Sequence, residues 1–164
     1  MKRKFCSLVF FVVAFSASAD ISGRIVRVLD GDTVEILESG NRLTRVRLAG
    51  IDAPEKSQPF GQRSRQELSS MVAQLPVTVT GSETDRYGRL LGTIWLGMTD
   101  VNAEQVRKGL AWAYRYHGNP VRPDYAVLEA EARRQSVGLW SEPGQTEPWR
   151  WRSLHQDEQK TNKN

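Results

Sequence analysis

The sequence contains one cysteine among its 164 residues, and that cysteine, Cys6, lies close to the N-terminus. A fold supported by disulfides is therefore excluded. Only two histidines occur, His117 and His155, and they are far apart, so the sequence offers no His and Cys cluster of the kind that holds zinc. The apolar run from Phe5 to Phe15 is too short to cross a bilayer as a helix.

That apolar run instead has the setting of a secretory signal peptide. Basic residues precede it at positions 2–4, and Ala17-Ser18-Ala19 matches a small-residue cleavage site. We expect cleavage after Ala19, which would give a secreted or periplasmic protein with no membrane segment in its mature form. A buried N-terminal helix is the alternative interpretation.

Cleavage would also change the charge balance. The net charge of +4 includes Lys2, Arg3 and Lys4, and removing these three leaves 20 basic against 19 acidic residues. A uniformly basic protein that coats nucleic acid is therefore not indicated. Any anion binding must come from a local cluster of cations.

The remaining residues are enough for one domain with one hydrophobic core, which we assign to residues 20–152, and we expect a monomer. Residues 153–164 are polar and offer little to bury, so we predict a disordered tail. Trp149 and Trp151, just before that tail, suit either packing on the domain or contact with a partner.

Short runs rich in Val and Ile, separated by turn residues, predict five strands. They cover Ser22–Leu29, Thr33–Leu37, Leu43–Ala49, Val77–Thr80 and Leu90–Leu96. Between the first two, Asp30-Gly31 predicts a hairpin turn, because glycine tolerates positive φ.

Three helices are predicted from apolar spacing and from end signals. The first carries Leu68, Met71, Val72 and Leu75 on one stripe and is stopped by Pro76. The second lies near Asn102–Lys108. The third begins at Pro123-Asp124, turns Tyr125, Leu128 and Ala132 inward, and ends at Gly138. A helix after the third of five strands indicates an α+β fold with a five-stranded OB-type β-barrel and three helices, an architecture that binds oligonucleotides or oligosaccharides.

Charged residues gather at three breaks between these elements. They are Asp30-Gly-Asp-Thr33, the stretch from Arg45 to Glu55, and Arg86-Tyr-Gly-Arg89. Each has a structural alternative as a turn or as a solvated strand face. Together they supply what phosphodiester hydrolysis needs, namely oxygen ligands for a hard cation, a carboxylate base and arginines that pair with phosphate oxygens.

The ordered motifs Asp30-Gly-Asp-Thr33, Arg47-Leu-Ala-Gly-Ile-Asp-Ala-Pro-Glu55 and Asp85-Arg-Tyr-Gly-Arg89 resemble those of the staphylococcal (micrococcal) nucleases. The resemblance continues through Val101-Asn102 to Gly138-Leu139-Trp140. It implies a thermonuclease-like fold and calcium-dependent hydrolysis of DNA and RNA to 3′-phosphate ends.

The resemblance also implies roles for individual residues. Asp32, Asp52 and the backbone carbonyl of Ala53 match the calcium ligands, and Glu55 matches the proposed general base. The family's best-known member has threonine in place of Ala53, and its loop after the residue matching Glu55 is longer. The remaining matches are Arg47 and Arg89 to the arginines that clamp phosphate, Arg86 and Tyr87 to positions flanking the nucleotide, and Tyr114 and Tyr116 to an aromatic pair near the base.

Two other functions stay open on the sequence alone. A non-catalytic OB-type nucleic-acid-binding module would usually lack one or more of the five charged residues, all of which are present here. An oligosaccharide-binding barrel would carry aromatic platforms rather than paired arginines on its binding face. Burial of Tyr114 and Tyr116 against the barrel is an equal alternative to their contact with a base.

Overall fold

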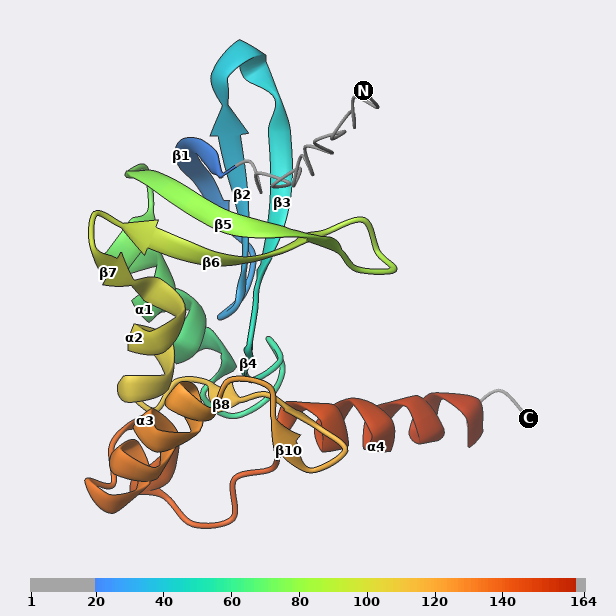
Figure 1. The fold of residues 1–164 in the computed structure, drawn as a ribbon. Helices are drawn as coiled ribbons and strands as arrows, with labels where there is room; N and C mark the ends of the chain where they lie inside the picture. Colours follow the sequence, from blue (N-terminus) through green and yellow to red (C-terminus); the bar gives the residue numbers. More distant parts are fainter. Residues whose placement is uncertain (1–19, 162–164) are drawn as a thin grey trace, which may run out of the picture.

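The computed structural model describes residues 20–161, and five of its strands form a closed barrel (Figure 1). They are β1 (Ile21–Val28), β2 (Thr33–Glu38), β3 (Leu43–Leu48), β5 (Pro76–Thr84) and β6 (Leu90–Leu96). β1, β2 and β3 form an antiparallel meander, and β5 pairs antiparallel with both β1 and β6. β3 and β6 pair in parallel, with Val46 opposite Leu90, and this pairing closes the barrel. The predicted OB-type α+β class is confirmed.

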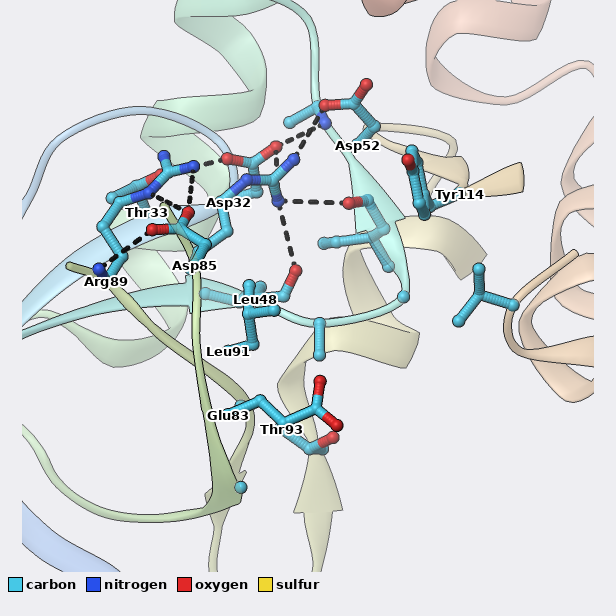
Figure 2. Close-up of a pocket in the computed structure, with 18 of the residues that line it drawn as sticks. Asp32, Thr33, Leu48, Asp52, Glu83, Asp85, Arg89, Leu91, Thr93 and Tyr114 are labelled. Carbon is cyan, nitrogen blue, oxygen red and sulfur yellow. Dashed lines mark hydrogen bonds and ion pairs between the residues drawn. The ribbon is translucent and has the colours of Figure 1, made fainter. Parts of the chain in front are cut away.

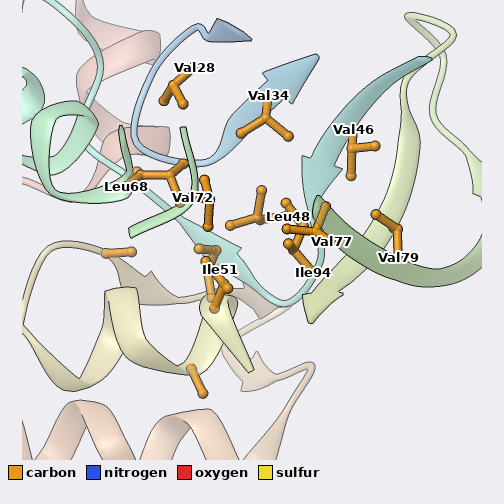
Figure 3. Packing of buried hydrophobic residues seen from close by; sticks show 14 of the residues in the cluster. Val28, Val34, Val46, Leu48, Ile51, Leu68, Val72, Val77, Val79 and Ile94 are labelled. Atoms are coloured by element: carbon orange, nitrogen blue, oxygen red, sulfur yellow. The ribbon is translucent and has the colours of Figure 1, made fainter. Parts of the chain in front are cut away.

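Alternation along these strands produces the core. Val34 and Ile36 of β2, and Val46 and Leu48 of β3, are buried because successive side chains of a strand point to opposite faces. Figure 3 shows Val34, Val46 and Leu48 in the same core cluster as Leu68 and Val72 of the helix that covers one end of the barrel.

That covering helix is α1 (Gly61–Val72), and it is shorter than predicted. Leu68 and Val72 are fully buried, but Leu75 lies outside the helix and is 40% exposed. The chain leaves the helix at Ala73, whose ψ is 130°, and Gln74 then adopts a left-handed conformation at φ 63°, so the helix ends before Pro76.

Further short elements lie in the connections between the barrel strands and in the chain that follows β6. They are η1 (Ser39–Asn41), β4 (Ile51–Asp52), β7 (Thr99–Asp100), α2 (Val101–Arg107), β8 (Trp112–Ala113), β9 (Arg115–Tyr116) and β10 (Asn119–Pro120). β4 pairs with β8 in a separate two-stranded sheet, and β9 pairs with β10. Asp100 caps α2 by accepting a hydrogen bond from the backbone N–H of Ala103.

Helix α3 (Pro123–Arg134) buries Tyr125 and Ala132, as predicted, but it does not end at Gly138. Ser136, at φ 52°, takes the left-handed position just past the helix, and Gly138 begins the 3₁₀ turn η2 (Gly138–Ser141). A Cβ on Gly138 would lie 2.3 Å from the carbonyl oxygen of Gly109. This glycine therefore serves close packing between two segments.

A fourth helix, α4 (Pro148–Thr161), replaces most of the predicted disordered tail. It projects from the body of the molecule in Figure 1. The prediction of disorder assumed that only apolar burial attaches a segment, whereas α4 is attached by its buried Pro148 and by ion pairs of Arg152. The predicted signal peptide and residues 162–164 lie outside the described residues. Within residues 20–161 no helix is long and apolar enough to cross a membrane.

Candidate active site

A cleft of about 990 Å³ opens at one end of the barrel. Its walls come from the turn between β1 and β2, the end of β3 and the loop after it, and the hairpin between β5 and β6. Three residues from later in the chain also line it, namely Tyr114, Val121 and Arg152. Figure 2 shows Asp32 between Arg89 on one side and Asp52 on the other. Three segments that are separate in the sequence thus place their charged groups around one opening.

The β1–β2 turn presents Asp32. The backbone N–H of Asp32 donates to Oδ1 of Asp30 at 3.1 Å, and the Thr33 hydroxyl donates to Oδ1 of Asp32 at 3.1 Å. Beneath the turn, Nε2 of buried Gln105 donates to the carbonyl of Gly31 at 2.7 Å. A Cβ on Gly31 would lie 1.9 Å from Oγ of Ser64. Gly31 does not have the positive φ that we predicted, so glycine is required here by this close approach.

Asp52 and Ala53 reach the site from the opposite direction, on and just after β4. The backbone N–H of Ala53 donates to Oδ2 of Asp32 at 2.6 Å, which fixes the two segments against each other. The loop leading to β4 is held by Asn102, a fully buried residue whose side-chain amide donates to the carbonyls of Ala49 and Gly92. The segment that carries Asp52 and Ala53 is therefore tied both to Asp32 and to α2.

Arg47, at the end of β3, bridges the two aspartates. Its Nη1 lies 3.1 Å from Oδ2 of Asp32, and its Nη2 lies 2.8 Å from Oδ1 of Asp52. Nη1 also donates to the carbonyls of Leu48 and Ile51, each at 3.1 Å. The side chain is only 15% exposed, so Arg47 is a structural counter-ion as well as a cation facing the cleft.

The charge around Asp32 is only partly balanced. Burial raises the pKa of Asp32 to about 8; Arg47 and the hydrogen bond from Ala53 act against this rise, while Asp30 and Asp52 add to it. A nearby cation stabilises the ionised form of a buried carboxylate and lowers its pKa. Added positive charge close to Asp32 would therefore favour its ionised form.

Arg89 enters from the β5–β6 hairpin and is held by one carboxylate. Its Nε and Nη2 lie 2.8 and 2.7 Å from Oδ2 of Asp85. Burial tends to raise the pKa of Asp85, but hydrogen bonds from Arg89 and from the backbone N–H of Tyr87 outweigh it, so the pKa is lower than usual. This paired arrangement aims the guanidinium toward the cleft before any substrate is present.

The predicted nucleotide-contacting residues divide into two groups. Arg86, Tyr87 and Tyr114 line the cleft, and Arg86 stacks on the Tyr87 ring at 4.9 Å. Tyr87 is 67% exposed, which leaves most of its ring available. Tyr116 does not line the cleft, is 64% exposed and packs edge-on against His117. The structure therefore separates the predicted aromatic pair.

Arg152 is the residue that sequence reasoning missed. From α4 its guanidinium lies 2.8 Å from Oδ2 of Asp52 and 2.6 Å from Oε1 of Glu55. The Trp and Arg alternation over residues 149–152 was the only sign of it in the sequence. Trp151 packs within the helix, stacked on His155 with ring centroids 4.2 Å apart, and Trp149 is half-buried.

The donor set fits a hard divalent cation. Asp32 and Asp52 provide carboxylate oxygens that converge on the same guanidinium, and the uncompensated burial of Asp32 favours added positive charge. No group of three or more acidic, histidine or cysteine side chains arranged for a metal occurs in the described part of the chain. A cation here would need backbone carbonyl, water or substrate oxygens as further ligands, which calcium readily accepts.

An OB-type barrel with carboxylates and arginines around one cleft defines a protein that acts on phosphodiesters. The comparisons agree with this class. The family model described as "Staphylococcal nuclease homologue" matches residues 45–142. A micrococcal nuclease of Shigella flexneri is 47% identical over 160 residues, covering 92% of this chain and 91% of the relative.

Two further relatives come from Escherichia coli. Protein ParB is 48% identical over 161 residues, covering 93% of this chain and 90% of that protein. A protein named only as an uncharacterised endonuclease, from Escherichia coli O157:H7, is 48% identical over 154 residues, covering 92% and 97%. The chain belongs to the staphylococcal nuclease family. It is a nuclease, a hydrolase whose substrate is nucleic acid.

Proposed function

We propose that this nuclease is secreted, depends on calcium and hydrolyses both DNA and RNA to 3′-phosphate ends. The observation that carries the proposal is the convergence of Asp32, Asp52 and Arg47 at one edge of a cleft whose other edge holds Arg89. These groups recognise phosphate and a hard cation, which are common to every nucleotide. Sequence and sugar specificity would require contacts to bases or to the 2′-hydroxyl.

In this proposal Asp32, Asp52 and the carbonyl of Ala53 hold calcium, which when bound supplies Lewis-acid polarisation of a phosphate oxygen. Arg47 and Arg89 bind phosphate oxygens and stabilise the charge that grows as phosphorus becomes five-coordinate. Both guanidiniums are held in place by carboxylates beforehand, so little reorganisation accompanies the reaction.

Glu55 is the proposed base. Its side chain is 40% exposed at the cleft, which allows water to approach. Glu55 takes a proton from water, the water oxygen bonds to phosphorus, and the bond from phosphorus to the 5′ oxygen breaks. A solvent water molecule donates a proton to the 5′ oxygen as it leaves, and the phosphate remains on the 3′ oxygen.

Tyr87 and Tyr114 are the proposed base contacts. Stacking on an aromatic ring tolerates every base, which agrees with broad substrate use. Tyr116 does not line the cleft, so we assign it a smaller role in base contact. The cations Arg86 and Arg89 next to Tyr87 would attract the adjoining phosphates.

The test is a cleavage assay on matched DNA and RNA oligonucleotides, each with calcium, with magnesium and with a chelator. We expect cleavage of both in calcium, none in chelator, and products that a polymerase extends only after phosphatase treatment. Glu55→Gln should lose activity, whereas Glu83→Gln, a cleft-lining control outside the proposed set, should not. Cleavage that persists in chelator, or products extended without phosphatase, would contradict the proposal.

Secretion and a monomeric state have their own tests. The proposed signal peptide predicts that the protein is recovered from the medium or the periplasm with Asp20 as its first residue, which N-terminal mass spectrometry would detect. A cytoplasmic protein that still begins at Met1 would refute it. Gel filtration of the purified protein should give the mass of a single chain.

A further inference from the structure

Arg152 occupies the carboxylate oxygens that the proposed reaction needs. Its Nη1 lies 3.2 Å from Oδ1 of Asp52 and 2.6 Å from Oε1 of Glu55, while Nη2 lies 2.8 Å from Oδ2 of Asp52. Oδ1 of Asp52 also accepts from Arg47. Both oxygens of Asp52 and one oxygen of Glu55 are thus already bound to guanidinium groups.

The formal charges at the site explain why Arg152 is held there. When fully ionised, Asp32, Asp52 and Glu55 would carry three negative charges, whereas Arg47 and Arg152 carry two positive charges. With a divalent cation present, Arg47 and that cation alone would balance the three carboxylates. The positive charge of Arg152 would then no longer be needed for this balance. The cation and the Arg152 guanidinium would repel each other, because both would contact Asp52, whose side chain is only 1% exposed.

The way in which α4 is attached would allow Arg152 to move away from Asp52 and Glu55. Its N-terminal end is fixed to the loop after Glu55, because Nε2 of buried Gln58 donates to the carbonyl of Thr146 at 2.5 Å and Pro148 is buried. Beyond Pro148, Arg152 makes all of the ion pairs between α4 and the barrel that occur among the described residues. The rest of α4 projects away from the molecule (Figure 1).

We infer that Arg152 competes with the divalent cation for Asp52 and Glu55, so that docking of α4 and loading of the site oppose each other. The inference rests on the proposed cation site. In the absence of the cation, Arg152 neutralises the two carboxylates and keeps α4 against the cleft. Cation binding displaces the guanidinium, which returns Glu55 to water and frees the part of the cleft that Arg152 lines.

The two equilibria must be linked reciprocally. If α4 docking weakens cation binding by some factor, cation binding weakens α4 docking by the same factor. This gives two independent measurements, calcium affinity and the protection of α4, that must change together. Neither measurement requires turnover of a nucleic acid.

Calorimetric titration with calcium tests the first side of this linkage. Arg152→Ala should bind calcium at least tenfold more tightly than the unchanged protein, which corresponds to about 1.4 kcal/mol. Arg150→Ala is the matched control, because Arg150 is on the same helix, is exposed and pairs with Glu147 at 3.6 Å. Its calcium affinity should stay within twofold of the unchanged protein. Equal or weaker binding in Arg152→Ala would overturn the inference.

Hydrogen exchange at the backbone amides of residues 151–155 tests the second side. Saturating calcium should speed exchange in the unchanged protein and in Arg150→Ala. In Arg152→Ala, exchange should be fast with or without calcium. Exchange that calcium leaves unchanged in a protein that binds calcium would overturn the inference.

Failure of the inference can be told from failure of the proposed function. If the unchanged protein and Arg152→Ala bind calcium equally, only the competition by Arg152 is refuted. If neither protein binds calcium and cleavage survives chelator, the proposed cation site is refuted, and the inference falls with it.

Discussion

The two proposed phosphate-binding arginines should differ sharply in what they do for stability. Arg89 is 25% exposed and pairs with Asp85 on a hairpin. Arg47 is 15% exposed and joins the buried carboxylates of Asp32 and Asp52 while donating to two backbone carbonyls. Alanine at either position removes a phosphate ligand, but only alanine at Arg47 leaves buried groups without their counter-ion.

The magnitudes follow from these surroundings. Arg89→Ala should lower kcat by about 10²–10³, the usual loss for one preorganised donor to a developing charge. Its unfolding free energy should fall by less than about 1 kcal/mol, as for a partly exposed pair. Arg47→Ala should lose at least as much activity and about 3 kcal/mol of stability, which is the lower end for breaking a buried pair, because Asp52 keeps Arg152.

Both quantities can be measured on the same preparations. Steady-state cleavage of one oligonucleotide at saturating calcium gives kcat and KM, and urea unfolding followed by tryptophan fluorescence gives stability. In a domain of this size, about 3 kcal/mol lowers Tm by about 10 °C. Arg86→Ala is the matched control, since Arg86 lies on the same hairpin and stacks on Tyr87. It should change KM more than kcat.

Two results would refute this reasoning. If Arg89→Ala kept its kcat within threefold of the unchanged enzyme, the guanidinium held by Asp85 would not serve the transition state. If Arg47→Ala were as stable as Arg89→Ala, the contacts of Arg47 with Asp32 and Asp52 would not contribute to the folded state as the geometry indicates.

Three more outcomes are expected. Calcium at 100 times its dissociation constant should stabilise the protein by about 2.7 kcal/mol in a thermal melt, and Asp52→Asn should abolish most of this gain. Gly31→Ala should lower stability by about 1–3 kcal/mol in urea unfolding, because its Cβ would overlap Ser64, whereas a neutral effect would show that the turn can move. Asp85→Asn should be less stable than the unchanged protein at pH 7 by under about 1 kcal/mol. Because the folded-state pKa of Asp85 is depressed, this difference should vanish as pH falls through that pKa; a difference that persists in acid would have another cause.

Local pattern was sufficient for the barrel and for the charged segments of the site. The alternation of Val34, Ile36, Val46 and Leu48 identifies strands with one face toward the core, because side-chain direction in a strand has a period of two. The end of α1 was less predictable. Leu75 fits the helical stripe by spacing, but the backbone leaves the helical conformation at Ala73, before Leu75 is reached.

Residue spacing does not predict that Tyr114 lines the cleft and Tyr116 does not. Residues two apart share a face only within a continuous strand. Here β8 ends at Ala113 and the two-residue β9 begins at Arg115, so Tyr114 lies between strands and Tyr116 turns away from the cleft. The requirement for glycine at position 31 is likewise tertiary, because a Cβ there would overlap the side chain of Ser64 on α1.

The sequence by itself therefore determined the five barrel strands, the fold class and the identity of the charged segments, because these depend on the order and spacing of nearby residues. Only the tertiary structure decided which charges meet. The pairing of Arg152 with Asp52 joins residues 100 positions apart, and Gln105 supports the β1–β2 turn from 74 positions away. Such contacts depend on how helices pack on the barrel, and no local pattern encodes that packing. The same packing turned a polar tail into a helix whose arginine reaches the centre of the site.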